Sequence, residues 1–258
     1  HRLPADCYFA PGVVNGDIDA TWAYTQSNYD ELFSTAVCPE LDGVVVTFSE
    51  NEGCDVWDSG CFKFTGTTPQ TRGAEAVQKV LETVQASCHT YSKMCYARTW
   101  AGTNQWDVSN GIVLTGDKST WMMNKNVGGS GGLDWWDMDS HLDCIGSVAD
   151  DGYNEMIEFD LCGEYMGRGH YTFATTNYLK DHYWNWAYTH GVRGGMVARI
   201  DREGSLSYFT ANRIGLYALD QIMAGGVAAN VPDPAAVNLA WCQQYFPADA
   251  AQDIADHY

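Results

Sequence analysis

The stretch YNEMIEFDLCGEY, residues 153–165, alternates acidic and apolar side chains. Three of its carboxylates, Glu158, Asp160 and Glu164, occupy even positions, and apolar residues occupy positions 157, 159 and 161. Because successive side chains of a β-strand point to opposite faces, this stretch predicts a strand with one acidic and one apolar face. The apolar face predicts a sheet that packs on a core. The acidic face is either a catalytic cleft or a solvated surface.

Other segments of the chain carry strand or helix signals on either side of this stretch. Strands are expected within 43–66, at 111–117 (GIVLTGD), and at 196–201 with 205–209 as a hairpin. Helices are expected at 74–88, 211–223, 234–246 and 248–257, the third with Asp233 as N-cap and Pro234 in its first turn.

Strands and helices alternate in this prediction without a regular strand–helix–strand rhythm. The predicted fold class is therefore α+β, a mainly antiparallel sheet with several packed helices, stabilised by disulfides. Residues 1–258 are expected to form a single domain, and the glycine-rich loop at 127–132 is the place for a subdivision.

The nine cysteines are scattered along the chain, and none forms a C-x-x-C pair. At this density they predict an oxidising compartment and a disulfide framework with one cysteine left over, for which Cys242 is the candidate. The sequence begins HRLPADCYF, which we interpret as a mature form whose export segment has been removed. We therefore expect a secreted, extracellular protein.

Charge and hydropathy exclude several classes of partner. The chain has 14 basic and 33 acidic residues, a formal net charge of −19, so a nucleic-acid partner is not expected. No apolar run approaches the roughly 20 residues that span a bilayer, so membrane insertion is not expected either. The remaining partners are a neutral or cationic polysaccharide or a target at a cell surface, and we expect a monomer.

The acidic face of the 153–165 stretch suits glycosidic chemistry. Same-face neighbours on a strand lie about 6.6 to 7 Å apart, and glycosidases use carboxyl groups roughly 5 to 9.5 Å apart. Glu158 and Asp160 are thus the candidate catalytic pair, supported by Glu164. The spacing resembles the E-x-D-x-x-E strand of retaining jelly-roll glycoside hydrolases. It departs from that pattern because Glu164 comes six residues after Glu158 instead of five.

Tryptophan clusters supply candidate sugar-binding surfaces. Trp135 and Trp136 adjoin Asp137 in an acidic loop, and Trp184 and Trp186 lie in the segment DHYWNWAYTH. Indole faces stack on the apolar faces of sugar rings, and Asp137 would bind hydroxyl groups. Tryptophan is also a common core residue when its N–H finds a partner, and the sequence leaves both interpretations open.

A histidine at the first position raises a copper alternative. His1 could bind copper through its amine and its ring, as in the histidine brace of lytic polysaccharide monooxygenases. A processing site explains the same residue without a metal. We expect no cofactor and no metal, with His1 as the alternative.

Residues 61–117 resemble a second kind of secreted protein. CFKFTGT, the helix with Cys88, and WDVSNGIVLTGD resemble the strand–helix–D-V-S-x-G–strand portion of fungal KP4-type killer toxins. The resemblance implies a secreted, disulfide-held α+β protein that acts at cell surfaces and is not an enzyme. The chain departs from it at Cys88 and Cys95, which are six residues apart where the toxins have a closer pair.

Acidic and aromatic residues gather in the same region, 134–188. We therefore expect a secreted, glycoside hydrolase-like enzyme that acts on a polysaccharide of the cell-wall type. The first alternative is a non-enzymatic, killer-toxin-like effector. The second is a carbohydrate-binding protein, or a copper-binding protein that uses His1.

Overall fold

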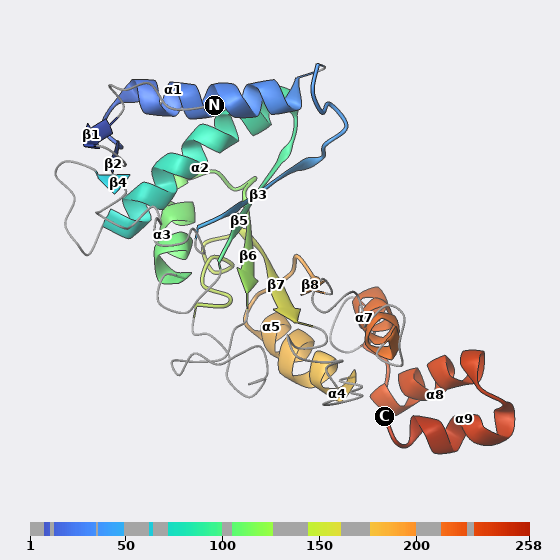
Figure 1. Cartoon of the computed structure of the whole chain (residues 1–258). Coiled ribbons are helices and arrows are strands. Elements are labelled where there is room, and N and C mark those ends of the chain that lie inside the picture. The colour runs from blue at the N-terminus through green and yellow to red at the C-terminus, as the bar shows by residue number, and fades with distance from the viewer. Residues whose placement is uncertain are drawn as a thin grey trace. The chain divides into compact units, whose positions relative to one another are not determined.

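The computed structural model describes most of the chain (Figure 1), and the statements below concern only this part. The described residues are 8–10, 13–34, 36–48, 62–63, 72–99, 105–125, 144–160, 176–199, 213–225 and 230–258.

The main sheet has five strands in the order β3-β5-β6-β7-β8. They are β3 (Gly43–Thr47), β5 (Met94–Arg98), β6 (Trp121–Lys125), β7 (Asn154–Asp160) and β8 (Met196–Arg199). The sheet is parallel, with Val44 opposite Cys95, Ala97 opposite Met122, and Ile157 opposite Met196. The predicted α+β class with a mainly antiparallel sheet is therefore wrong, and the fold is of the α/β type.

Three short strands form a second sheet in the order β1-β2-β4. They are β1 (Tyr8–Ala10), β2 (Val13–Asn15) and β4 (Phe62–Lys63). β1 runs antiparallel to β2, and β2 runs parallel to β4.

The helices connect or follow the strands. They are α1 (Asp19–Phe33), α2 (Arg72–Tyr91), α3 (Gln105–Thr115), α4 (Thr176–Tyr178), the π-helix η2 (Leu179–Asn185), α5 (Trp186–Thr189), α7 (Arg213–Gly225), α8 (Pro234–Tyr245) and α9 (Ala248–Ala255). The predicted N-cap of α8 is confirmed, because Asp233 accepts hydrogen bonds from the main-chain N–H groups of Ala235 and Ala236.

The strand expected at 111–117 is wrong, because α3 runs through Thr115. Its buried residues Gln105, Val108, Ser109 and Ile112 recur at helical spacing, so one stripe of the helix faces the core. The resemblance to the killer toxins implied a strand here, and that local feature is absent. Only the first strand of the hairpin expected at 196–209 lies within the described residues. It is β8, which ends at Arg199 and pairs in parallel with β7, whereas residues 205–209 lie outside the described part.

Strand order in the main sheet follows sequence order without reversal. This is the order of (β/α) barrels, whereas doubly wound sheets reverse direction at a switch point. In both architectures ligands bind where the carboxyl ends of the strands meet the following loops. The loops 49–61, 126–143, 161–175 and 200–212, which follow β3, β6, β7 and β8, lie outside the described residues.

The chain divides into two compact units. The first comprises 1–125 and 147–155, and the second comprises 126–146 and 156–258. In the first unit α2 contacts both α1 and α3, and the three helices are seen together in Figure 1. Its core includes Val77, Leu81, Ile112 and Met122, all fully buried.

The second unit has its own core. Ile157 of β7 packs with Leu179, Trp184, Ala187 and Ile222. A smaller cluster joins α8 and α9 to α7, with members Ile214, Trp241, Cys242, Ala251 and Ala255. Each unit therefore buries apolar side chains in a core of its own.

The predicted disulfide framework is wrong for the cysteines that the structure describes. These are free thiols: Cys38, Cys88, Cys95, Cys144 and Cys242. Cys88 at the end of α2 and Cys95 in β5 are neighbours, and they interact by a hydrogen bond between their thiols. This bond lowers the pKa of Cys88, whereas it and burial raise the pKa of Cys95. The other cysteines lie outside the described residues, and the cysteine argument for an oxidising compartment loses its support.

Candidate functional site

The acidic stretch forms strand β7, as its alternation predicts. Glu158 is only 4% exposed, so its carboxyl group does not lie on a solvated surface. Its neighbour Ile157 belongs to the opposite face of β7 and packs in the core of the second unit. In the pairing of β7 with β8, Glu158 lies opposite Val197 and Asp160 lies opposite Arg199.

The position of Asp160 and Arg199 at the ends of their strands has a chemical consequence. Both are the last residues of parallel strands, where α/β proteins place their functional groups. The register thus brings one acidic and one basic residue to the carboxyl edge, two positions after the buried Glu158.

The other sequence-based site residues fall into two groups. Glu164, Trp135, Trp136, Asp137 and His1 lie outside the described residues. Trp184 is 3% exposed in the core of the second unit, so its indole faces are taken by protein contacts. Trp186 is half-buried and stacks on the ring of His190, with 4.1 Å between ring centroids.

A cluster of buried polar side chains lies at the carboxyl ends of β5 and β6 in the first unit. Its members are Thr99 after β5, Gln105 at the start of α3, Asn124 and Lys125 at the end of β6, and Glu155 in β7. Each is at most 1% exposed. Polar groups buried to this degree are costly unless they are hydrogen-bonded, and these form a connected network.

The hydrogen bonds of this network are donated in one direction, from Gln105 and the main chain of Lys125 through Thr99 and Asn124 to Glu155. Thr99 Oγ1 accepts from the main-chain N–H of Lys125 at 2.9 Å and from Gln105 Nε2 at 3.4 Å. With both lone pairs used, the Thr99 hydroxyl donates its proton to Asn124 Oδ1 at 2.8 Å. Asn124 must therefore turn its Nδ2 toward β7, where it donates to Glu155 Oε1 at 3.0 Å. Glu155 Oε1 acts as an acceptor.

The same network also fixes the last residue of β6. The main-chain N–H of Lys125 donates to Thr99, and its carbonyl oxygen accepts from Gln105 Nε2 at 2.9 Å. The main-chain N–H and C=O of Lys125 are therefore both hydrogen-bonded to side chains, and the Lys125 side chain is fully buried. The first unit thus buries one amine and one carboxyl group at this edge of the sheet.

The sequence analysis missed this network because it considered the alternation of side chains along strands and not the polar residues at the ends of strands. MCYAR and WMMNK are largely apolar strands that end in polar residues, and Thr99 follows the first of them. A parallel sheet collects such ends at one edge. If β5 and β6 had been recognised as strands, their polar ends would have pointed to Asn124 and Lys125.

A serine, a histidine and an aspartate also meet at the end of α2, but their geometry is not that of a catalytic triad. His89 Nε2 lies 3.0 Å from Asp117 Oδ2 and 3.1 Å from Ser119 Oγ. A triad needs the two histidine nitrogens to contact different partners, the acid on one side and the nucleophile on the other. Here Ser119 Oγ instead donates to Asp117 Oδ1 at 2.7 Å.

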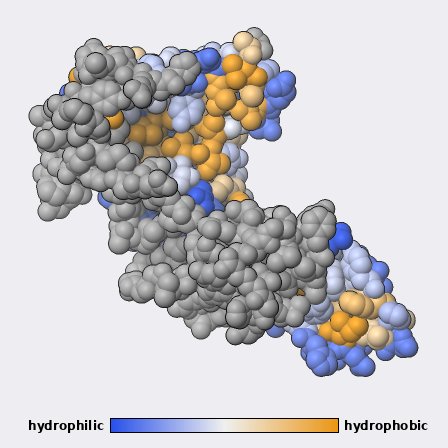
Figure 2. Space-filling view, viewed as in Figure 1, coloured by the Kyte–Doolittle hydropathy of each residue, from blue (hydrophilic) through white to orange (hydrophobic). Residues whose placement is uncertain are grey.

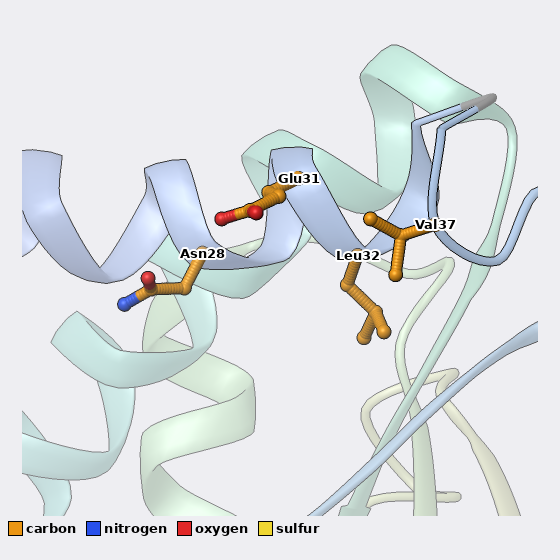
Figure 3. Close-up of a pocket in the computed structure, with 4 residues that line it drawn as sticks. All are labelled: Asn28, Glu31, Leu32 and Val37. Atoms are coloured by element: carbon orange, nitrogen blue, oxygen red, sulfur yellow. The ribbon is translucent and has the colours of Figure 1, made fainter. Parts of the chain in front are cut away.

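One surface hollow, of about 330 Å³, lies beside α1 and is lined by Asn28, Glu31, Leu32 and Val37 (Figure 3). Figure 2 shows apolar surface over the turn after α1, where Val37 is half exposed. Among the described residues that line this hollow, Glu31 is the only titratable one. No group of three or more metal-binding side chains occurs among the described residues.

Comparisons with known proteins give no lead to function. No protein-family model matches the sequence, and neither curated proteins nor solved structures give a match. Within the described part of the chain, no helix is long and apolar enough to cross a membrane.

Proposed function

We propose that this chain is a hydrolase that cleaves glycosidic bonds of a polysaccharide with Glu158 and Asp160 as its paired carboxylates. The supporting observation is the burial of Glu158, which is 4% exposed in β7, the strand that ends at Asp160. A solvated acidic face would leave this carboxyl group open to water. A carboxyl group held away from water near the end of a parallel strand suits a catalytic role.

The chemistry follows from the spacing of the two residues. Same-face residues on a strand are about 6.6 to 7 Å apart, which falls within the range of glycosidase carboxyl pairs. One carboxylic acid protonates the leaving oxygen of the glycosidic bond. The other carboxylate activates water or attacks the anomeric carbon. We propose proton donation as the role of Glu158 and the second role for Asp160.

The partner proposed from the sequence, a neutral or cationic polysaccharide, stays part of the proposal. A net charge of −19 favours such polymers over anionic ones. Secretion also stays a proposal. It now follows from the proposed substrate, since cell-wall polymers are insoluble and lie outside the cell, and no longer from the cysteines. The roles of Glu164, Asp137, Trp135 and Trp136 stay predictions, since these residues lie outside the described part.

The test compares Glu158→Gln and Asp160→Asn with wild type on a panel of β-glucan, xylan, mannan and chitosan, and counts reducing ends. Glu40→Gln is the matched control, because Glu40 is an exposed glutamate in the turn before β3. We expect both strand variants to lose roughly a hundredfold or more of kcat/KM, as removal of an acid or base does. The control should retain wild-type activity.

A second substrate assigns the two roles. Aryl glycosides with an acidic phenol as leaving group need little protonation, so loss of the general acid harms their cleavage least. Glu158→Gln should keep more of its activity on such a substrate than Asp160→Asn does. If wild type releases no sugar from any polymer, or both variants match wild type with intact circular dichroism, the proposal is wrong. A growth-inhibition assay would then test the toxin-like alternative.

A further inference from the structure

The bond from Asn124 to Glu155 joins the end of β6 to the start of β7. We propose that Asn124 and Glu155 are positioning residues that anchor β7, the strand that carries Glu158 and Asp160. The proposal rests on the proposed function, because it gives the buried network a role in the same reaction. Neither residue is expected to touch the substrate.

Alternation along β7 separates the anchor from the catalytic face. Glu155 shares its face of β7 with Ile157, whereas Glu158 belongs to the other face. An anchor at Glu155 therefore leaves the face of Glu158 to the substrate. Glu155 is three residues before Glu158 in the same strand.

The anchor is itself held in one orientation. Thr99 and Gln105 determine which end of the Asn124 amide faces β7, as the hydrogen-bond directions require. The orientation of the Asn124 amide is therefore fixed independently of its hydrogen bond to Glu155 in β7. Such supporting bonds are how proteins hold a reacting group within a fraction of an ångström of its productive position.

The choice of a carboxylate for this anchor has a chemical reason. A hydrogen bond to an ionised oxygen is roughly twice as strong as one between neutral groups. Because burial of a carboxyl group is costly, an apolar residue at position 155 would serve a purely structural contact better. The network keeps the polar pair, which fits a requirement for strand position and not only for stability.

The test exchanges the two functional groups between the strands. Asn124→Asp alone sets two carboxylates against each other, whereas Glu155→Gln alone leaves an amide oxygen that still accepts from Asn124. The double variant Asn124→Asp/Glu155→Gln restores an amide donor facing a carboxylate with unchanged net charge. We expect Asn124→Asp to lower kcat by roughly tenfold or more with KM little changed, Glu155→Gln to have a smaller effect, and the double variant to recover most of the loss.

Two further pairs keep the test decisive. Thr99→Val removes the hydroxyl that sets Asn124, and Thr99→Ser retains it, so the serine variant should be close to wild type and the valine variant impaired. Asn124→Asp should also regain activity at acidic pH, where one proton shared between the two carboxyl groups relieves their repulsion. A residue that only stabilises the fold would not produce this pH-dependent recovery.

An activity-independent measurement separates this inference from the proposed function. Amide hydrogen exchange, read by mass spectrometry, should rise in 156–160 of Asn124→Asp and return in the double variant, while α8 and α9 stay unchanged. Unchanged exchange in β7 overturns the anchor, as does faster exchange with undiminished cleavage. If Glu158→Gln abolishes cleavage while the Asn124 and Glu155 variants keep it, the proposed function stands and this inference falls. If wild type cleaves no polymer, the catalytic role falls with the proposed function, and exchange alone then decides whether the strand is anchored.

Discussion

Gly111 of α3 lies so close to Val77 of α2 that a β-carbon added at Gly111 would come within 2.4 Å of Val77 Cγ1. The same added atom would lie 2.9 Å from the carbonyl oxygen of Ala74. Both neighbours belong to a well-packed helix, and one of them is main chain. The two helices that pack together in the first unit therefore meet through the bare backbone of Gly111.

Gly111→Ala should destabilise the protein by about 1 to 3 kcal/mol, the usual cost of overpacking a core. Alanine is a better helix former than glycine by about 1 kcal/mol, so helix propensity alone would stabilise the variant. A fall in the free energy of unfolding therefore indicates the clash. Urea unfolding gives the free energy of unfolding. Asn110→Ala is the control, because Asn110 is exposed on the same helix and should be neutral or stabilising. A Gly111→Ala protein as stable as wild type would contradict this packing.

The helix α3 also explains why the sequence predicted the wrong sheet. GIVLTGD contains a β-branched, apolar run that favours a strand locally. The decisive pattern begins earlier, at Gln105 and Val108, and a strand assigned from residue 111 cuts it in two. With α3 taken for a strand, the alternation β3-α2-β5-α3-β6 disappears. That alternation is what identifies a parallel sheet.

The candidate site was predictable to a different extent on each strand. Glu158 was found because period-two alternation is local and is visible within seven residues of sequence. The network of Thr99, Asn124 and Glu155 was not, because it joins positions far apart in the chain. Such a network depends on which strands are neighbours, and β5 and β6 were not recognised as strands.

Asp107 makes the first unit sensitive to pH. Burial raises the pKa of this carboxyl group above its ordinary value of 3.8. The stability that comes from the neutral form is present below that value and is lost as the pH rises through the folded-state pKa. Asp107→Asn should therefore gain stability relative to wild type as the pH is raised from 3.5 toward neutrality.

Thermal unfolding at a series of pH values measures this difference. Asp249→Asn is the control, since Asp249 is exposed in the first turn of α9 and its removal changes the net charge equally. A difference between wild type and Asp107→Asn that stays constant with pH would show that the group titrates alike in the folded and unfolded chain.

The free thiols can be counted directly. Denatured protein, alkylated with iodoacetamide without reductant, should carry the label at five described positions: Cys38, Cys88, Cys95, Cys144 and Cys242. In the native protein Cys38 should react first, because it is half-buried and the others are buried. A peptide pair linked through any two of these residues, seen by mass spectrometry before reduction, would contradict the thiol assignment.

Trp184 should affect stability and not sugar binding. Because it is buried in the core of the second unit, Trp184→Ala should cost about 3 to 5 kcal/mol, as large-to-small core changes do. Trp184→Phe keeps an aromatic ring and should cost less. Trp186→Ala, at a half-buried position, is the comparison. Polysaccharide pull-down of folded Trp184→Phe at the wild-type level supports a core role, and lost binding with unchanged stability opposes it.

Asp233 should contribute to stability through its side-chain oxygen at the start of α8. Its Oδ1 accepts from the main-chain N–H of Ala235 at 2.9 Å and of Ala236 at 3.3 Å. Asp233→Ala leaves these donors to water and should cost about 1 kcal/mol in urea unfolding, whereas Asp233→Asn keeps an acceptor and should cost less. Asp249→Ala is the control, because α9 has no side-chain N-cap bond and Asp249 is exposed. If Asp233→Asn proves as damaging as Asp233→Ala, the charge near the helix terminus matters more than the hydrogen bonds, and added salt should then reduce the loss.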